Sequence, residues 1–212
     1  MTDLRYKYYT TFESVQGAVT SLSISADGKY LAATGEWQCH TWSTNSIGVF
    51  GAAVWDLNSL TLPGVRARDE EKRLFSTSAW LCFDDGSGDT FRYVLILGCL
   101  NGDVTALDLN EEEMLQANRL PIAPSTAQQV VSLDVQQPEV GNRSHARVVA
   151  SFADSIIKCW TLCFDGDFEL VFSMTLEPSF FPKTVCFDKE NQRVLVFSKR
   201  GGVWFVILPL FV

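Results

Sequence analysis

The chain lacks the features that mark several kinds of protein. It has only two histidines, and none of its six cysteines forms a CxxC pair, so neither a zinc site nor a disulfide framework is indicated. Acidic side chains outnumber basic ones by 25 to 17, whereas phosphate backbones bind concentrated Lys and Arg. No apolar run reaches membrane-spanning length, and Met1–Lys7 contains no secretory signal core. We therefore expect no metal or other cofactor, no nucleic-acid or membrane partner, and a cytoplasmic or nuclear location with reduced thiols.

What the chain does contain is a strand pattern that recurs four times. The first strand of each repeat reads Leu22-Ser23-Ile24, Leu81-Cys82-Phe83, Leu133-Asp134-Val135 and Val185-Cys186-Phe187. The last residues of these phrases are spaced by 59, 52 and 52 positions. The third strands, anchored at Trp55, Leu107, Trp160 and Val206, are spaced by 52, 53 and 46. Repeats of this length that contain only strands predict one small sheet each, and such sheets pack radially into a β-propeller.

Turn residues separate the strands within each repeat. Ala26-Asp27-Gly28 predicts a tight turn, because Asp can accept a bond from its own backbone and Gly adopts positive φ. Asn101-Gly102 is a strong hairpin signal, because a type I′ turn needs positive φ at both of its central residues. We expect one domain over residues 1–212, with repeats at about 6–57, 73–109, 114–162 and 168–208. Outer strands are expected at Arg73–Ser76, Met114–Leu120 and Phe168–Thr175.

The first repeat carries a resemblance to a known family. The residues from Val19 to Ala33, followed by Val54-Trp55-Asp56-Leu57, resemble a WD40 repeat. The other three repeats are degenerate versions, the Gly-His pair common in that family is absent, and the Trp-Asp pair is intact once. The resemblance implies an all-β, WD40-like propeller of four blades. It also implies a non-catalytic scaffold that binds protein or peptide partners through loops on the propeller rim.

Four repeats are fewer than the about seven blades of about 45 residues that are usual for this family. The chain either closes a small ring, with Tyr6–Phe12 pairing beside Val203–Ile207, or forms an open part of a larger propeller. An open arc has edge blades through which copies can self-associate. The apolar end after Ile207, interrupted by Pro209, indicates a truncated gene model or a natural fragment. The alternative function is that of a truncated fragment of a larger WD40 protein that folds only by self-association.

Residues 36–47 are expected to be an insertion between the second and third strands of the first repeat. From Ile24 to Trp55 there are 31 positions, against 24, 25 and 19 in the other repeats. One interpretation is a recognition loop built on Trp37, His40 and Trp42, because aromatic-rich loops on rigid scaffolds often bind partners. The other interpretation is retained intron sequence.

The candidate binding residues lie in the loops between second and third strands, which are expected to form one rim. They are Trp37, His40, Trp42, Asn101, Asp154, Lys199 and Arg200. The rival function is that of a propeller hydrolase, which needs acidic, amide or imidazole groups converging on a metal at the axis. The first strands offer Ser, Cys and Asp134 for this purpose, so we expect no catalytic residues. Trp55, Trp160 and Trp204 are expected to pack between blades.

Overall fold

The computed structural model describes residues 18–35, 51–57, 65–68, 74–84, 91–109, 128–138, 145–163, 168–188 and 193–207. All regular structure in these ranges is β-strand, so they contain no helix that could cross a membrane. The strands are β1 (Val19–Ile24), β2 (Tyr30–Gly35), β3 (Gly51–Asp56), β4 (Val65–Arg68), β5 (Phe75–Asp84), β6 (Phe91–Cys99), β7 (Val104–Leu109), β8 (Val130–Gln136), β9 (Ala146–Phe152), β10 (Ile156–Leu162), β11 (Phe168–Thr175), β12 (Pro182–Phe187), β13 (Arg193–Ser198) and β14 (Val203–Ile207).

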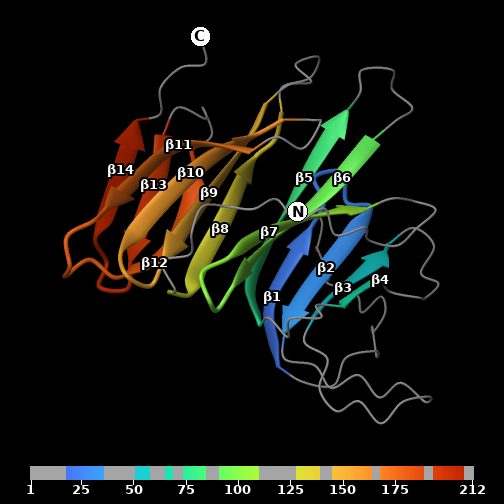
Figure 1. Cartoon of the computed structure of the whole chain (residues 1–212), viewed down its shortest axis with the longest axis horizontal. Coiled ribbons are helices and arrows are strands. Elements are labelled where there is room, and N and C mark those ends of the chain that lie inside the picture. Colours follow the sequence, from blue (N-terminus) through green and yellow to red (C-terminus); the bar gives the residue numbers. More distant parts are fainter. Residues whose placement is uncertain are drawn as a thin grey trace, which may run out of the picture.

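The strands form four antiparallel sheets in chain order. Sheet 1 contains β1–β4, sheet 2 contains β5–β7, sheet 3 contains β8–β11 and sheet 4 contains β12–β14. Within each sheet every strand pairs with the next one in the sequence, in the antiparallel direction. In Figure 1 the sheets follow one another from sheet 1 on the right to sheet 4 on the left. The expected architecture of four successive small sheets is therefore confirmed.

The first strand of each sheet lies at the inner side of the stack. β1 lies against β5, β5 against β8, and β8 against β12. Among the described strands no comparable contact joins β12 back to β1, and Figure 1 shows sheets 1 and 4 at opposite ends. The described sheets therefore follow one another as an arc, and Tyr6–Phe12, whose pairing beside Val203–Ile207 would close a ring, lie outside the described residues.

Among the described strands, each inner strand has a strand partner on only one side, so its remaining backbone groups need other partners. Side chains from the neighbouring sheet supply them. The donors and acceptors are Ser78 N to Ser21 Oγ at 3.2 Å, Cys82 N to Gln137 Oε1 at 2.9 Å, Val185 N to Ser132 Oγ at 3.2 Å and Phe187 N to Asp134 Oδ2 at 2.7 Å. These bonds fasten each sheet to the next at the inner edge.

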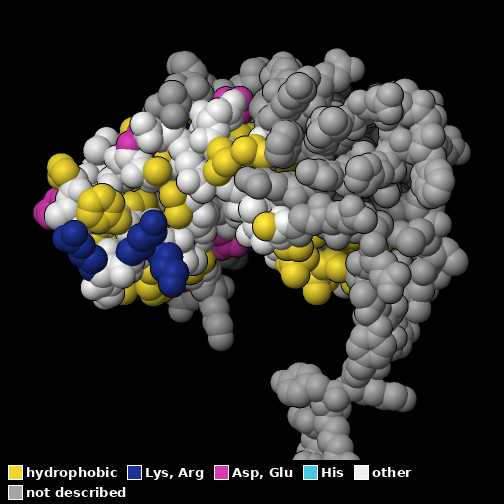
Figure 2. All heavy atoms as spheres, turned by 90° about the horizontal axis from the view of Figure 1, so that it is seen from below, with side chains coloured by type: hydrophobic (Ala, Val, Ile, Leu, Met, Phe, Trp, Pro, Cys, Tyr) yellow, Lys and Arg dark blue, Asp and Glu magenta, His cyan; other side chains and the backbone are white. Residues whose placement is uncertain are grey.

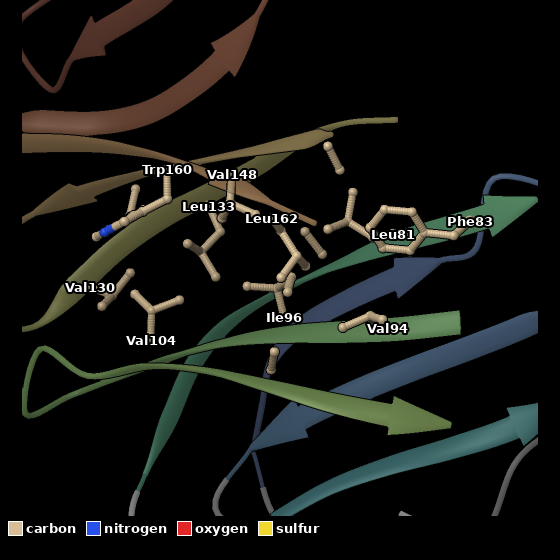
Figure 3. Close-up of a cluster of buried hydrophobic side chains, with 14 of the residues drawn as sticks. Leu81, Phe83, Val94, Ile96, Val104, Val130, Leu133, Val148, Trp160 and Leu162 are labelled. Carbon is tan, nitrogen blue, oxygen red and sulfur yellow. The ribbon is translucent and has the colours of Figure 1, made fainter. Parts of the chain in front are cut away.

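Apolar cores fill the space between successive sheets. The cluster between sheets 2 and 3 is drawn in Figure 3, where Leu81 and Ile96 of sheet 2 approach Leu133 and Leu162 of sheet 3. A second cluster joins sheets 1 and 2 around Trp80, and a third joins sheets 3 and 4 around Ile157. Each small sheet is thus stabilised by burial against its neighbours.

The strand boundaries differ from expectation mainly in the second sheet. Phe75 and Ser76 begin the long inner strand β5 and do not belong to a separate outer strand, and β4 is the outer strand of sheet 1. β11 spans the residues expected for an outer strand, Phe168–Thr175. The predicted elements at Tyr6–Phe12, residues 36–47 and Met114–Leu120 lie outside the described residues.

Candidate functional site

Three turns between second and third strands share one geometry. In each turn a backbone N–H bonds the carbonyl three residues earlier, and the donor residue has positive φ. The bonds are Gly102 N to Cys99 O at 3.2 Å, Ser155 N to Phe152 O at 3.1 Å and Gly201 N to Ser198 O at 3.2 Å. Glycine adopts this conformation readily, and Ser155 adopts it at φ 67° with its hydroxyl donating to Phe180 O at 2.7 Å.

These turns are tied to the segments that enter the inner strands. The residue after each second strand donates its N–H to the residue just before the inner strand of the same sheet. The bonds are Leu100 N to Leu74 O at 2.8 Å, Ala153 N to Gln129 O at 2.9 Å and Lys199 N to Phe181 O at 2.9 Å. The turns and the entry segments therefore lie together at one end of the sheets, which we call the turn rim.

The turn rim brings four of the predicted binding residues to one end of the molecule. Asn101, Asp154 and Arg200 occupy the same position in three successive turns, and Lys199 precedes Arg200. Asn101 bonds the backbone N–H and the carboxylate of Asp103, at 3.1 and 2.8 Å. Asp154 accepts a long bond of 3.4 Å from the Ile156 N–H. The side chains of Asn101 and Asp154 therefore help to shape their own turns. The other three predicted binding residues, Trp37, His40 and Trp42, lie outside the described residues.

Lys199 and Arg200 are both exposed, and the Arg200 side chain lies beside an aromatic ring. The Arg200 guanidinium carbon lies 5.2 Å from the centroid of the Phe181 ring, and Phe181 is 41% exposed. The Arg200 N–H bonds Ser198 Oγ at 3.0 Å, which holds the backbone of the turn. The arrangement joins a cation to an accessible aromatic face.

Two further residues complete this corner, which consists of Phe181, Lys183, Lys199, Arg200 and Trp204. The Trp204 ring is 40% exposed and packs edge-on against Phe180 at 6.1 Å, while Lys183 is exposed at the start of β12. Figure 2 shows Lys and Arg side chains beside hydrophobic ones at the end formed by sheet 4. We call these five residues the basic aromatic corner.

The sequence had not singled out Phe181, Lys183 or Trp204 as binding residues. Trp204 was expected to pack between blades, and it does contact Phe180, but much of its ring is accessible. The signal that could have indicated Phe181 is its place in Phe180-Phe181-Pro182, directly before an inner strand. Since the chain carries a net charge of −8, three cations in one corner stand out from the average.

At the opposite end of sheets 1 and 2, Asp27 is the acceptor in a polar network. Its carboxylate accepts bonds from the Ser25 hydroxyl at 2.6 Å, the Tyr93 hydroxyl at 2.6 Å and the Lys29 N–H at 3.1 Å. Burial alone raises the pKa of Asp27, but these hydrogen bonds outweigh it and hold that pKa below 3.8. Burial and the bond to Asp27 raise the pKa of Tyr93. The network links the turn between β1 and β2 to β6, so we assign it a structural role.

Asp134 is the acid that a hydrolase would need near the axis, and its carboxylate already accepts a backbone hydrogen bond that joins two sheets. It accepts the Phe187 N–H at 2.7 Å, and burial raises its pKa despite that bond. Nowhere in the described ranges do three His, Cys, Asp or Glu side chains gather as a metal site. The thiol of Cys82 also lies near the inner edge, where burial, followed by the charges of Asp27 and Asp84, raises its pKa to about 11. A thiol with that pKa is a poor nucleophile at neutral pH.

Comparison with solved structures identifies the fold. The chain is 16% identical to the β-propeller domain of Cps50 (Swd1) from Myceliophteria thermophila over 90% of its length, with a TM-score of 0.55. It matches a chain of the mitotic checkpoint complex over 98% of its length, at 14% identity and a TM-score of 0.59. The computationally designed Ika4 protein matches over 97% of this chain and 100% of its own, at 17% identity and a TM-score of 0.63. The chain therefore has a β-propeller fold.

The chain spans different shares of the length of these structures, and all of the Ika4 chain. The chain spans 52% of the Cps50 domain and 54% of the checkpoint-complex chain, about half of each. No protein-family model matches the sequence. No curated protein matches it either.

Proposed function

We propose that the chain is a WD40-like scaffold without catalytic activity that binds a protein partner through the basic aromatic corner. Three observations support the proposal: the WD40-like phrase of the first repeat, the propeller fold, and the likeness to a chain of an assembly, the mitotic checkpoint complex. The observation that carries the binding site is the exposed Arg200 guanidinium stacked on the exposed Phe181 ring.

The chemistry of the corner favours an acidic peptide segment that also contains an apolar side chain. Lys183, Lys199 and Arg200 supply positive charge, and Phe181 and Trp204 supply apolar surface. Arginine, with its planar fork of donors, binds carboxylates in pairs of hydrogen bonds, and aromatic residues supply much of the energy at interfaces. The support beneath the site is rigid, because the turn is bonded to the entry segment and Phe180 is buried.

A peptide array provides the test, because the natural partner need not be known. Purified protein is applied to peptides of fixed length whose composition ranges from acidic to basic. We expect binding to acidic peptides that contain apolar residues, and a loss of about tenfold or more with Lys199→Glu and Arg200→Glu together. Added salt should weaken the binding.

A matched control is available at the start of β13, the strand that leads into the turn with Arg200. Arg193 is exposed at the other end of β13, and its guanidinium carbon lies 5.8 Å from the centroid of the exposed Phe205 ring. Arg193→Glu therefore makes the same change of charge beside a ring of the same kind. Arg200→Glu should reduce binding and Arg193→Glu should not. Equal losses for both variants, or no preference for acidic peptides, would contradict the proposal.

A further inference from the structure

The four inner strands can be aligned residue by residue, because each contains the same irregularity. Pairing with the second strand shifts register by one residue after the first paired position, leaving Thr20, Ser76, Val131 and Lys183 as the extra residues. Counting from this bulge places Leu22, Ser78, Leu133 and Val185 at one level. The alignment shows what each position contacts in each sheet.

The face of each sheet that packs on the preceding sheet is its upstream face. On the inner strands of sheets 2, 3 and 4 two upstream positions are buried: Phe75, Val130 and Pro182 at the first, and Ser78, Leu133 and Val185 at the second. The corresponding residues of sheet 1 are Val19 and Leu22, which are 51% and 65% exposed. Ile24, at the level of Trp80, Val135 and Phe187, is 60% exposed. Sheet 1 thus has apolar side chains where the other sheets have a neighbour.

The opposite, downstream face of each sheet shows the same contrast on the third strand. In sheets 1, 2 and 3 two downstream positions are buried against the next sheet: Ala52, Val104 and Ile157 at the first, and Val54, Ala106 and Cys159 at the second. Register places Val203 and Phe205 of β14 at these two positions, and they are 56% and 59% exposed. Ile207, two residues further along, is 69% exposed.

Among the described residues, the polar contacts between inner strands also have one half at each end of the stack. Ser21 and Ser132 occupy the same level and accept the N–H of Ser78 and Val185 respectively, each at 3.2 Å. On β12 that level is occupied by Thr184, whose side chain is exposed. On β1 the matching donor is the backbone N–H of Leu22. One chain therefore carries an acceptor at one end and the corresponding donor at the other.

We propose that two copies of this chain bind head to tail, with the downstream face of sheet 4 of each copy packed on the upstream face of sheet 1 of the other. The two faces are the halves of a junction that the chain already makes three times internally. The partner is a second copy because one chain presents both halves. The product is a closed ring of eight sheets with two equivalent junctions.

The mass in solution tests the proposal. Light scattering on the purified full chain at micromolar concentration should give the mass of two 23.7 kDa chains. Leu22→Asp and Phe205→Asp each place a charge in one half of every junction, and each variant alone should have the mass of one chain. Both side chains are exposed within a single chain, so the variants should keep the circular dichroism of the parent. Leu100→Asp is the matched control, because Leu100 is 38% exposed on the turn rim and should leave the mass at two chains.

Mixing the two aspartate variants distinguishes head-to-tail pairing from symmetric pairing of like faces. When one copy of each variant pairs, both aspartates lie in the same junction and the other junction contains only parental residues. An equal mixture should therefore recover the mass of two chains, with an affinity at least tenfold weaker than that of the parent. Thr184→Val removes the acceptor while keeping the shape, and should weaken association about fivefold.

Several outcomes would overturn the proposal. A parental mass of one chain, or of more than two, excludes a ring formed by two arcs. An unchanged mass for Leu22→Asp or Phe205→Asp places the contact elsewhere, and an equal mixture that stays monomeric excludes head-to-tail pairing. The proposal does not depend on peptide binding at the basic aromatic corner. Lys199→Glu with Arg200→Glu should therefore leave the mass at two chains.

Discussion

The junction between sheets 2 and 3 and the outward face of sheet 4 use the same strand positions with opposite results. Val104 and Ala106 of β7 are buried against sheet 3, whereas Val203 and Phe205, at the same levels of β14, are mostly exposed. All four residues are apolar. Their burial is therefore decided by the place of the sheet in the stack and not by the character of the strand.

The same two regions differ in the size of their side chains. Gly98 in β6 lies at the level of Thr34 and Ser151, and all three small residues face a following sheet. In sheet 4 this level is occupied by Phe197. Inside the stack a small residue lets the sheets approach closely, and at the end of the stack that restriction is absent within one chain.

The largest expected effect comes from truncating a leucine inside the junction. Leu81 is fully buried between sheets 2 and 3, so Leu81→Ala should lower the free energy of unfolding by about 2 to 5 kcal/mol. The matched variant Leu22→Ala changes an exposed leucine and should have an effect of about 0.5 kcal/mol or less in dilute protein. Urea denaturation at low protein concentration measures both. Equal losses would show that Leu22 is buried within the single chain.

A smaller loss is expected when a methyl group is added at the same junction. A Cβ on Gly98 would lie 2.6 Å from Val130 Cγ1 and 2.8 Å from Thr77 Cγ2, and these β-branched side chains are stiff. Gly98→Ala should therefore cost about 1 to 3 kcal/mol. Gly202→Ala is the control in sheet 4, because its nearest neighbour would be the edge of the Phe180 ring at 3.2 Å. Thermal unfolding of both variants should rank Gly98→Ala as the more destabilised; the reverse order would contradict close packing at Gly98.

The polar network at Asp27 should give a still smaller, pH-dependent effect. Since its pKa is lower in the folded chain than the ordinary 3.8, the stability contributed by Asp27 is present above pH 3.8 and is lost as the pH falls below that value. Asp27→Ala should cost about 1 kcal/mol at neutral pH and less in acid, because the network lies near solvent. Unfolding measured from about pH 6 to pH 3 tests this. A cost that does not change with pH would mean that the charge contributes nothing.

The smallest perturbation uses cysteine reactivity to compare one position in two sheets. Cys159 is fully buried between sheets 3 and 4, where burial raises the pKa of its thiol to about 12, so iodoacetamide should modify it only after unfolding. Phe205→Cys places a thiol at the same level of the exposed strand. In dilute protein it should react at a rate close to that of a free thiol. Rapid native labelling of Cys159, mapped by mass spectrometry, would contradict the closed junction.

Much of the fold could be predicted from local pattern. β11 spans the residues expected for an outer strand, Phe168–Thr175, and the turns expected at Ala26-Asp27-Gly28 and Asn101-Gly102 join β1 to β2 and β6 to β7. The third-strand anchors Trp55, Leu107, Trp160 and Val206 do lie at one level, as their spacing indicated. The first-strand anchors were wrong in sheet 2, where Trp80 and not Phe83 lies at the level of Ile24. A bulge leaves no periodic signal, so register had to come from backbone pairing.

The candidate site was predicted only in part. Turn chemistry indicated Asn101, Asp154, Lys199 and Arg200 as neighbours in successive turns, and the hydrogen bonds of the turn rim place them so. Phe181 and Lys183 could not be linked to Arg200 from the sequence. Phe181 directly precedes β12 and Lys183 lies within it, whereas Lys199 and Arg200 follow β13. The bond from Lys199 N to Phe181 O brings the two segments together.

The sequence by itself determined that the chain is a succession of small antiparallel sheets, because strand periodicity and tight turns are local properties. The tertiary structure decided which of their apolar faces are covered and where cations meet aromatic rings. Burial depends on the neighbour that each sheet receives, and strands with the same pattern of residues become core inside the stack and exposed surface at its two ends.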